Sequence, residues 1–326
     1  MARTNAISLL AGASTPATLA EIYGRVIENV QKSTLSTTLK SQLYTGNPAA
    51  GSVEFKRFVN SASKAYGTAR AAAKGDKVTA PPTTVNLNQH KEIVEEVAKF
   101  DLDTFGVAGV MQRRADNHVV SMSAELDRAF FAQAAADGTA FSPASGVTAI
   151  QEIVERMIQT LETVHNDYVD GVDRSMMDLV LTPAKYGLLR TFLDTQSNPN
   201  VDTAGEEFGM YHGVRVYSCT RMPVTTETVE ESKTKTTVTD ALLMVRGAVA
   251  QPVVVNQYGD PEKIQLSNDY AVSLFYDYGT KALTPDLIFK LQTSTTAYQR
   301  LFELVMNAVT GQEDEPDKAR FQTEKG

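Results

Sequence analysis

The chain has 326 residues, enough for one large or two modest cores, and its 42% hydrophobic and 21% charged residues are typical of a globular protein. This composition excludes a chain that is disordered throughout. The sequence has no run of 18 apolar residues, so no membrane-spanning helix is predicted. The net charge of −8 argues against a dedicated nucleic-acid binder. The single cysteine, Cys219, excludes an intramolecular disulfide and fits a reducing compartment.

The first 51 residues are predicted to form an arm outside the compact core. Apolar residues between Leu19 and Val30 fall on one helical face, and a Ser/Thr-rich stretch then leads to a turn signal at Gly46-Asn47-Pro48. One amphipathic helix on a polar tether needs a surface to lie on. That surface is either the protein's own domain or a neighbouring molecule.

Residues 52–100 are predicted to form a long β-hairpin. A strand-like run begins at Val53, and Val85 and Leu87 alternate with polar residues on the return. Two arms of about 20 residues would reach roughly 65 Å at about 3.3 Å per residue. Because an isolated two-stranded ribbon is marginal in water, the hairpin is expected to lean on another chain.

Basic residues gather in this hairpin, and we take four of them as candidate inter-subunit contacts: Lys64, Arg70, Lys74 and Lys77. The composition fits two interpretations equally. In one, the charges only keep an exposed tip solvated. In the other, the tip docks on an acidic neighbour, since residues 131–326 carry 27 Asp and Glu against 16 Lys and Arg.

The remainder of the chain predicts a mixture of helices and strands. Residues 104–137 keep one apolar face and predict a single helix about 50 Å long at 1.5 Å per residue. A second helix is predicted at 150–164, a third at 183–193 and a last one from Tyr298 to Val309, followed by a disordered acidic tail. An exposed hairpin is expected at 225–239. The strands are expected at 177–181, 213–217, 241–245, 253–255, 271–275 and 287–291. The fold class is therefore α+β, with an elongated part and a compact part.

The sequence contains none of the short motifs that carry common chemistries. There is no Gly-rich phosphate loop, no paired-cysteine metal motif and no nucleophile elbow. The four histidines are far apart: His118 is expected to pack in a helix face, and His165 to lie at a solvated helix end. We predict that the protein is not an enzyme and needs no metal or cofactor.

The order of these parts resembles the major capsid proteins of tailed bacteriophages, which have the Hong Kong 97-type fold. Three short motifs carry the resemblance: Leu179-Val180-Leu181-Thr182-Pro183 before a helix, the series Gly209, Gly213, Val214, Val216, Ser218 and Pro223, and the stretch from Asp269 through Tyr278-Gly279 to Pro285. The resemblance implies an N-terminal arm (1–51), an E-loop hairpin (52–100), a peripheral domain with a spine helix (101–144), an axial domain (145–261), a return to the peripheral domain with a C-terminal helix (262–310) and a tail (311–326).

This resemblance implies a capsid protein that forms pentamers and hexamers around double-stranded DNA, in the virion, after assembly in the cytoplasm of a bacterial host. The implied partners are a separate scaffolding protein, because no segment of about 100 residues precedes the hairpin, a portal protein, non-specifically bound DNA and a decoration protein. Two alternatives remain open here. One is a shell protein of an encapsulin-type nanocompartment, and the other is an α+β enzyme with an unrecognised site.

Overall fold

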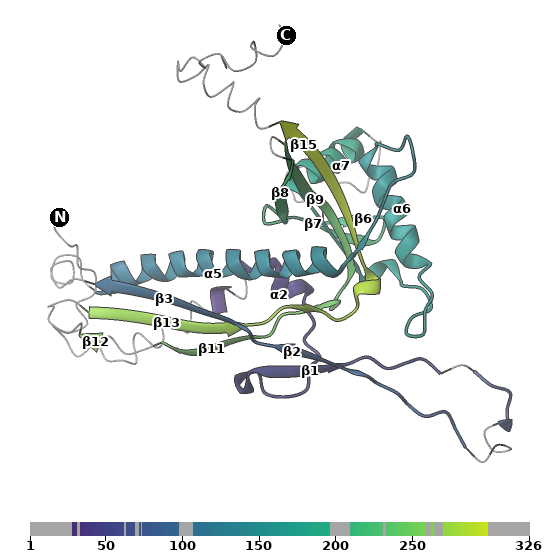
Figure 1. Cartoon of the computed structure of the whole chain (residues 1–326), viewed down its shortest axis with the longest axis horizontal. Helices are drawn as coiled ribbons and strands as arrows, with labels where there is room; N and C mark the ends of the chain where they lie inside the picture. Colours follow the sequence, from purple (N-terminus) through teal and green to yellow (C-terminus); the bar gives the residue numbers. More distant parts are fainter. Residues whose placement is uncertain are drawn as a thin grey trace, which may run out of the picture.

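The computed structural model describes residues 28–298 except for 31–32, 62, 69–71, 73, 98–106, 196–208, 231–232, 259–261 and 264–269. Three parts are visible in Figure 1. A compact part holds the largest sheet and two helices, an elongated layer places one long helix along a second sheet, and a hairpin projects away from both. No helix within the described ranges is long and apolar enough to cross a membrane.

The compact part is built on a seven-stranded sheet in the order β4-β15-β9-β5-β7-β6, with β8 paired to β9. Its strands are β4 (Thr139–Ala140), β5 (Met177–Leu181), β6 (Met210–Tyr211), β7 (Val214–Ser218), β8 (Val224–Glu230), β9 (Lys233–Val245) and β15 (Ile288–Tyr298). The pairs β5–β7 and β15–β4 are parallel, and the other pairs are antiparallel. Strands distant in sequence therefore meet in this sheet.

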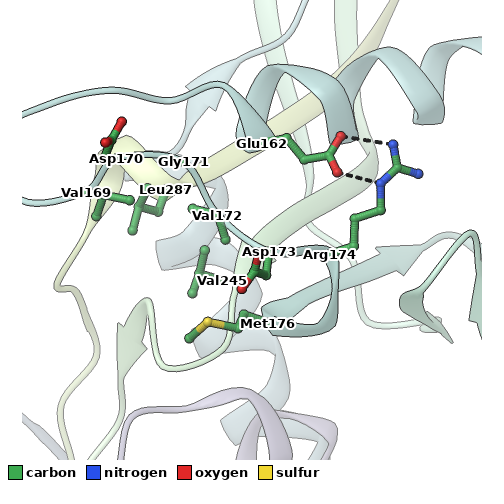
Figure 2. A pocket seen from close by; sticks show the side chains of 10 residues that line it. All are labelled: Glu162, Val169, Asp170, Gly171, Val172, Asp173, Arg174, Met176, Val245 and Leu287. Atoms are coloured by element: carbon green, nitrogen blue, oxygen red, sulfur yellow. Dashed lines mark hydrogen bonds and ion pairs between the residues drawn. The ribbon is translucent and has the colours of Figure 1, made fainter.

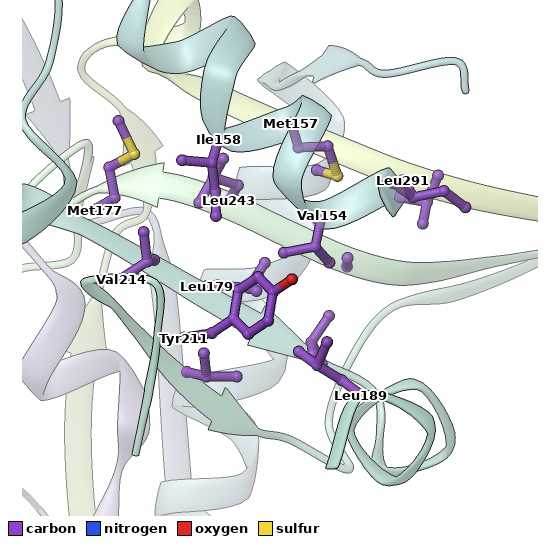
Figure 3. Close-up of a cluster of buried hydrophobic side chains, with 14 of the residues drawn as sticks. Val154, Met157, Ile158, Met177, Leu179, Leu189, Tyr211, Val214, Leu243 and Leu291 are labelled. Atoms are coloured by element: carbon purple, nitrogen blue, oxygen red, sulfur yellow. The ribbon is translucent and has the colours of Figure 1, made fainter. Parts of the chain in front are cut away.

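Side-chain alternation along β5 shows why this sheet is buried on both faces. Leu179 and Leu181 point to the side of α6 (Ile150–Glu162) and α7 (Pro183–Thr195), while Val180 points to the opposite side. Figure 3 shows the first of these clusters, in which Val154, Met157 and Ile158 of α6 pack against strand residues. The apolar stripe predicted for this helix is confirmed, because all six of its buried residues belong to the stripe.

The long helix α5 (Val107–Asp137) links the compact part to the elongated layer. Near its C-terminal end, Phe130, Phe131 and Ala134 are fully buried against the second face of the seven-stranded sheet. Toward its other end it lies along β3 (Gln89–Val97), β11 (Val253–Tyr258) and β13 (Tyr270–Tyr278), with β12 (Glu262–Lys263) at one side (Figure 1). The predicted long helix is confirmed over its described length.

The hairpin is shorter in regular structure than the sequence suggested. Strand β1 (Ser52–Lys56) pairs with β2 (Pro82–Asn86), and residues 57–81 between them carry no regular strand in their described part. The prediction that the hairpin extends to residue 100 is wrong, because β3 pairs along its whole length with β13 instead. The reason is burial: Val53, Phe55 and Val85 pack at the hairpin base, whereas alternate residues of β3 face α5.

The C-terminal strand also differs from expectation. We expected residues near 287–291 to return to the elongated part and a helix to follow Thr296. Strand β15 instead pairs with β9 in the compact sheet and continues to Tyr298. Its Thr-rich half lies opposite the Thr-rich half of β9, and β-branched residues favour such cross-strand pairing. The remainder of the predicted helix, the tail and residues 1–27 of the arm lie outside the described residues.

The remaining elements are short. They comprise α2 (Leu35–Leu39), β10 (Val249–Ala250), β14 (Lys281–Ala282) and the 3₁₀ turns η1 (Pro48–Ala50), η2 (Arg174–Met176) and η3 (Pro285–Leu287). They matter here because they join the hairpin and the arm to the rest of the protein.

Candidate assembly surfaces

The basic residues expected to make contacts lie at the hairpin tip, by which we mean residues 58–80. Lys64, Lys74 and Lys77 are all exposed, and Arg70 lies outside the described residues. Lys64 forms an ion pair with Asp76 on the returning arm, which holds the two arms together. Lys74 and Lys77 make no ion pair with any residue that the structure describes. Two of the four candidate cations are therefore uncompensated.

Large apolar side chains are also exposed along the tip. Phe58 is 62% exposed, Val78 is 69% exposed, and Tyr66 is fully exposed. Solvation of the tip alone does not require these apolar side chains. From the sequence, Phe58 and Tyr66 are the only aromatic residues near the basic positions and are too few for a groove that stacks nucleic-acid bases.

The root of the hairpin is fixed by a clamp of charged and polar groups. The Arg57 guanidinium donates two hydrogen bonds to the Asp286 carboxylate in η3, at 2.8 and 2.9 Å. Asn166 Nδ2 donates to the same carboxylate at 2.7 Å, and the Arg57 guanidinium lies 4.2 Å from the centre of the Tyr168 ring. The Asn60 side chain donates to the Tyr168 carbonyl at 2.8 Å. These contacts tie the first arm to the loop after α6.

This clamp also sets the protonation of Asp286. Burial alone would raise the pKa of the carboxyl group, but the hydrogen bonds and charge of Arg57, together with Asn166, outweigh burial and lower the pKa. The carboxylate therefore stays charged, and the bidentate pair fixes the direction in which the hairpin leaves the domain. No local sequence pattern predicts this pair, because 229 positions separate Arg57 from Asp286.

Close backbone packing fixes the other end of the hairpin. A Cβ atom added to Gly279 would lie 2.0 Å from the Asn86 carbonyl oxygen and 3.2 Å from the Leu87 Cα. Only glycine allows β2 to pass so close to the end of β13. Both ends of the hairpin are thus rooted in the protein, whereas the described residues between 61 and 80 form no hydrogen bond or ion pair with any described residue outside the tip.

The described part of the arm lies on the protein's own domain. Asp127 of α5 is buried and accepts hydrogen bonds from the backbone N–H groups of Leu35 and Ser36, at 3.3 and 2.9 Å, and from Arg221 at 2.7 Å. Leu39 is completely buried in the cluster beneath α5. Residues 35–39 of the arm therefore pack on the protein's own domain, which is one of the two surfaces expected for the arm.

Carboxylates on and beneath α5 hold the elongated layer together. Glu125 accepts hydrogen bonds from the Tyr276 and Tyr278 hydroxyls at 2.7 and 3.2 Å and pairs with Lys91 at 3.0 Å. Burial, reinforced by the Glu125 charge, raises the pKa of Tyr278 to about 12. His118 is buried as predicted, and its Nε2 lies 3.0 Å from Glu95 Oε1 of β3.

A cavity of about 690 Å³ lies beside η2. Figure 2 shows its lining, in which Arg174 is the only cation. Both Glu162 oxygens bind this guanidinium at 2.6 and 2.9 Å, and Glu155 binds it at 2.9 Å, so that it is fully engaged in cross-linking α6 to η2. Within the described ranges, no group of three His, Cys, Asp or Glu side chains could hold a metal.

The remaining candidates for chemistry are structural as well. His165 Nδ1 lies 2.7 Å from Asp170 Oδ1 with both side chains exposed, which agrees with a solvated helix end. Burial raises the pKa of the Cys219 thiol, which makes it a poor nucleophile near neutral pH. The described chain presents contact surfaces more clearly than a catalytic centre.

Comparison with known proteins decides the family. No curated protein sequence matches the chain. A sequence model described as phage capsid protein matches residues 91–291, which is more than half of the chain. The chain belongs to the phage capsid protein family. Its members are structural proteins, and this capsid protein is a subunit of an oligomeric virion shell, the function of a major capsid protein.

Solved structures show the same fold. The structure titled Mycobacterium phage Che8 is 18% identical, with a TM-score of 0.51 over 76% of this chain and 85% of that chain. The capsid of Cyanophage P-SCSP1u is 11% identical, with a TM-score of 0.57 over 79% of this chain and 88% of that chain. The capsid of an empty GTA particle is 12% identical, with a TM-score of 0.52 over 78% of this chain and 87% of that chain. The expected Hong Kong 97-type fold is confirmed.

Proposed function

We propose that this capsid protein assembles into pentamers and hexamers whose hairpin, acting as an E-loop, lies across a neighbouring subunit. In this proposal residues 1–51 form the arm, the hairpin carries the contact residues Lys64, Arg70, Lys74 and Lys77, α5 is the spine helix, and the seven-stranded sheet belongs to the axial domain. Many shallow contacts repeated around each ring then add up to a stable closed shell.

One observation carries the proposal: the hairpin is rigidly rooted at its base, yet the described residues between 61 and 80 form no hydrogen bond or ion pair with any described residue outside the tip. The Arg57–Asp286 pair and the close packing at Gly279 fix where it points. Phe58 and Val78 nevertheless remain mostly exposed. A monomer gains nothing from fixing the direction of an uncovered arm, whereas a shell subunit gains a pre-oriented contact.

The family also suggests the partners of this protein. We propose a scaffolding protein and a portal protein during assembly, packaged double-stranded DNA held by non-specific contact, and a decoration protein on the shell. We propose that assembly takes place in the cytoplasm of a bacterial host. Because phosphate contacts depend on Lys and Arg side chains, the net charge of −8 limits contact with DNA to local basic segments.

Expression of the full chain tests the proposal, with sedimentation and electron microscopy as readouts. We expect closed particles from the wild-type chain, with the scaffolding protein co-expressed if required. Replacing residues 58–80 with a short Gly-Ser turn should leave a soluble subunit with an unchanged melting temperature that forms no particles. Particles of normal yield without the tip would contradict the proposed role of the hairpin. Native particles filled with a cargo enzyme instead of DNA would favour the nanocompartment alternative.

A further inference from the structure

A small polar pocket lies where the arm passes over the beginning of β11. Its volume is about 350 Å³, and six of its nine lining residues belong to the arm, between Thr37 and Pro48. Lys40 is the only charged residue in this described lining, so the pocket holds one cation and no carboxylate. The backbone holds the pocket in place, because Ser41 N donates to the Val249 carbonyl at 2.8 Å.

The amine of Lys40 has no counter-charge. Lys40 is partly buried, and it forms no hydrogen bond or ion pair with any residue that the structure describes. Burial lowers the pKa of this amine. The partly buried guanidiniums of Arg57, Arg174 and Arg221, by contrast, each bind a carboxylate. Because a cation that loses water without gaining an anion is costly, an anion that enters this pocket removes that cost.

Hydroxyl groups beside the amine can complete the binding of an anion. Ser41 Oγ accepts the Leu43 backbone N–H at 3.4 Å, which leaves the hydroxyl proton available to donate. Tyr44 also lines the pocket, and its ring packs near Phe55 at the hairpin base, with ring centroids 6.0 Å apart. An amine and hydroxyl donors around one concavity suit a carboxylate, which only accepts hydrogen bonds.

The edge of this pocket is apolar. Leu43 is 86% exposed and Tyr44 is 45% exposed, and the two are consecutive in the arm. An exposed apolar pair next to an unpaired cation fits an occupant that combines apolar side chains with acidic ones.

The C-terminal segment has this composition, and the proposed function gives it no role. We call residues 313–317 the acidic run: four of its five residues are Asp or Glu, and none is basic. Four apolar residues of the predicted last helix precede it, namely Leu301, Phe302, Val305 and Val309. The run begins 15 positions after Tyr298, so an extended chain would reach up to about 50 Å from the end of β15.

We infer that the pocket at Lys40 binds a carboxylate of the acidic run, with the apolar residues that precede the run lying against Leu43 and Tyr44. The acidic run then acts as a strap that holds the arm in place. This inference goes beyond the proposed function, because it concerns the arm and the C-terminal segment and not the hairpin. A DNA phosphate is the competing occupant. One cation in a concave pocket suits it less, because DNA affinity comes from many Lys and Arg contacts along the backbone.

Zero-length cross-linking of the wild-type chain tests the inference directly. A water-soluble carbodiimide joins a lysine amine to a carboxylate only when the two groups touch. We expect peptides that link Lys40 to the acidic run, in dissociated subunits if the strap belongs to the same copy and only in particles if it belongs to an adjacent one. Particles mixed from ¹⁵N-labelled and unlabelled subunits identify the copy. Links from Lys40 only to other carboxylates, or none in either state, would overturn the inference.

The reactivity of the Lys40 amine gives a second, independent test. Changing all four acids of the run to Asn or Gln should raise the acetylation rate of Lys40 at least fivefold relative to that of exposed Lys56, because the amine loses its counter-charge and its cover. The matched control replaces Lys318 and Arg320 of the same segment with Gln, and it should leave this ratio unchanged. An unchanged ratio in the neutralised variant would overturn the inference. Protection of Lys40 that requires packaged DNA and not the run would assign the pocket to a phosphate, and would overturn it as well.

Discussion

The compact part and the hairpin are stabilised in different ways. The seven-stranded sheet is covered on both faces, and β5 is buried over its whole length. The hairpin has only a small apolar cluster at its base, a charged clamp at Arg57 and an uncovered tip. The buried apolar area of the sheet stabilises the compact part by itself. The partly exposed Arg57–Asp286 pair contributes little stability and mainly fixes the orientation of the hairpin.

This contrast explains how one chain can fold alone and still be built for a shell. Stability resides in the compact part and in the helix α5 that crosses it. In the proposed assembly, contact area resides in a segment that contributes little to the fold. Changes in the two regions should therefore have separable effects on melting and on assembly.

The largest effect is expected for a charge on the buried face of α5. Met122 is 1% exposed, so Met122→Asp should abolish soluble folding, because burying an unpaired carboxylate costs several kcal/mol, roughly the whole margin of a domain. The measurement is soluble yield together with a melting curve. The matched control is Val120→Asp on the same helix, where the side chain is 60% exposed and folding should be retained. Equal loss in both variants would mean that α5 is covered on both sides.

A smaller effect is expected at the junction of the hairpin with the elongated sheet. Gly279→Ala introduces a Cβ within 2.0 Å of the Asn86 carbonyl oxygen, so the strands must separate at a cost of about 1–3 kcal/mol. Melting should fall by a few degrees and assembly should fall with it. Gly187→Ala in α7, where no atom lies within 4 Å of the new Cβ, serves as the control and should raise stability by about 0.5–1 kcal/mol.

Much of the compact part could be predicted from the sequence because its signals are local. The stripe of α6 and the apolar run Met177–Leu181 each lie within one element, and periodicity alone located them. The long helix was found in the same way. The hairpin tip was located by its composition, which also showed its basic charge.

The pairing of distant segments could not be predicted in this way. The sequence of β3 alternates equally well for a hairpin arm or for a strand beside β13, and nothing local chooses between them. The Arg57–Asp286 clamp has no motif, because a bidentate pair requires only one residue at each end.

The clamp gives a moderate effect that depends on pH. Asp286→Asn should cost about 1 kcal/mol or less in melting, because the pair is partly exposed, yet it should reduce particle yield by releasing the hairpin direction. The folded-state pKa of Asp286 is lowered, so the pair contributes stability above the ordinary carboxyl range near pH 4 and loses it as the pH falls through the folded pKa. The wild type should therefore approach the Asn variant only below about pH 4. A difference in melting temperature between the wild type and the Asp286→Asn variant that grows at low pH would contradict this assignment.

The smallest effect on folding is expected at the tip itself. Reversing Arg70, Lys74 and Lys77 to Glu should change the free energy of unfolding by less than about 0.5 kcal/mol, since exposed charges contribute little. Particle yield should nevertheless fall sharply, because the penalty recurs at every subunit contact. Unchanged yield with an unchanged melt would mean that these charges only keep the hairpin solvated. A lowered melt would place them in the folded core.

Hydrogen exchange of residues 58–80, compared between the dissociated subunit and the assembled particle, tests the contrast between the two regions most directly. We expect most tip amides to exchange freely in the subunit and to become protected in the particle, because the described tip amides donate no backbone hydrogen bond except those of Val59, Asn60, Thr68 and Ala72. Amides of β5 should be equally protected in both states. Strong protection of the tip in the dissociated subunit, or no gain on assembly, would contradict the account that this hairpin is an element completed only by a neighbouring copy.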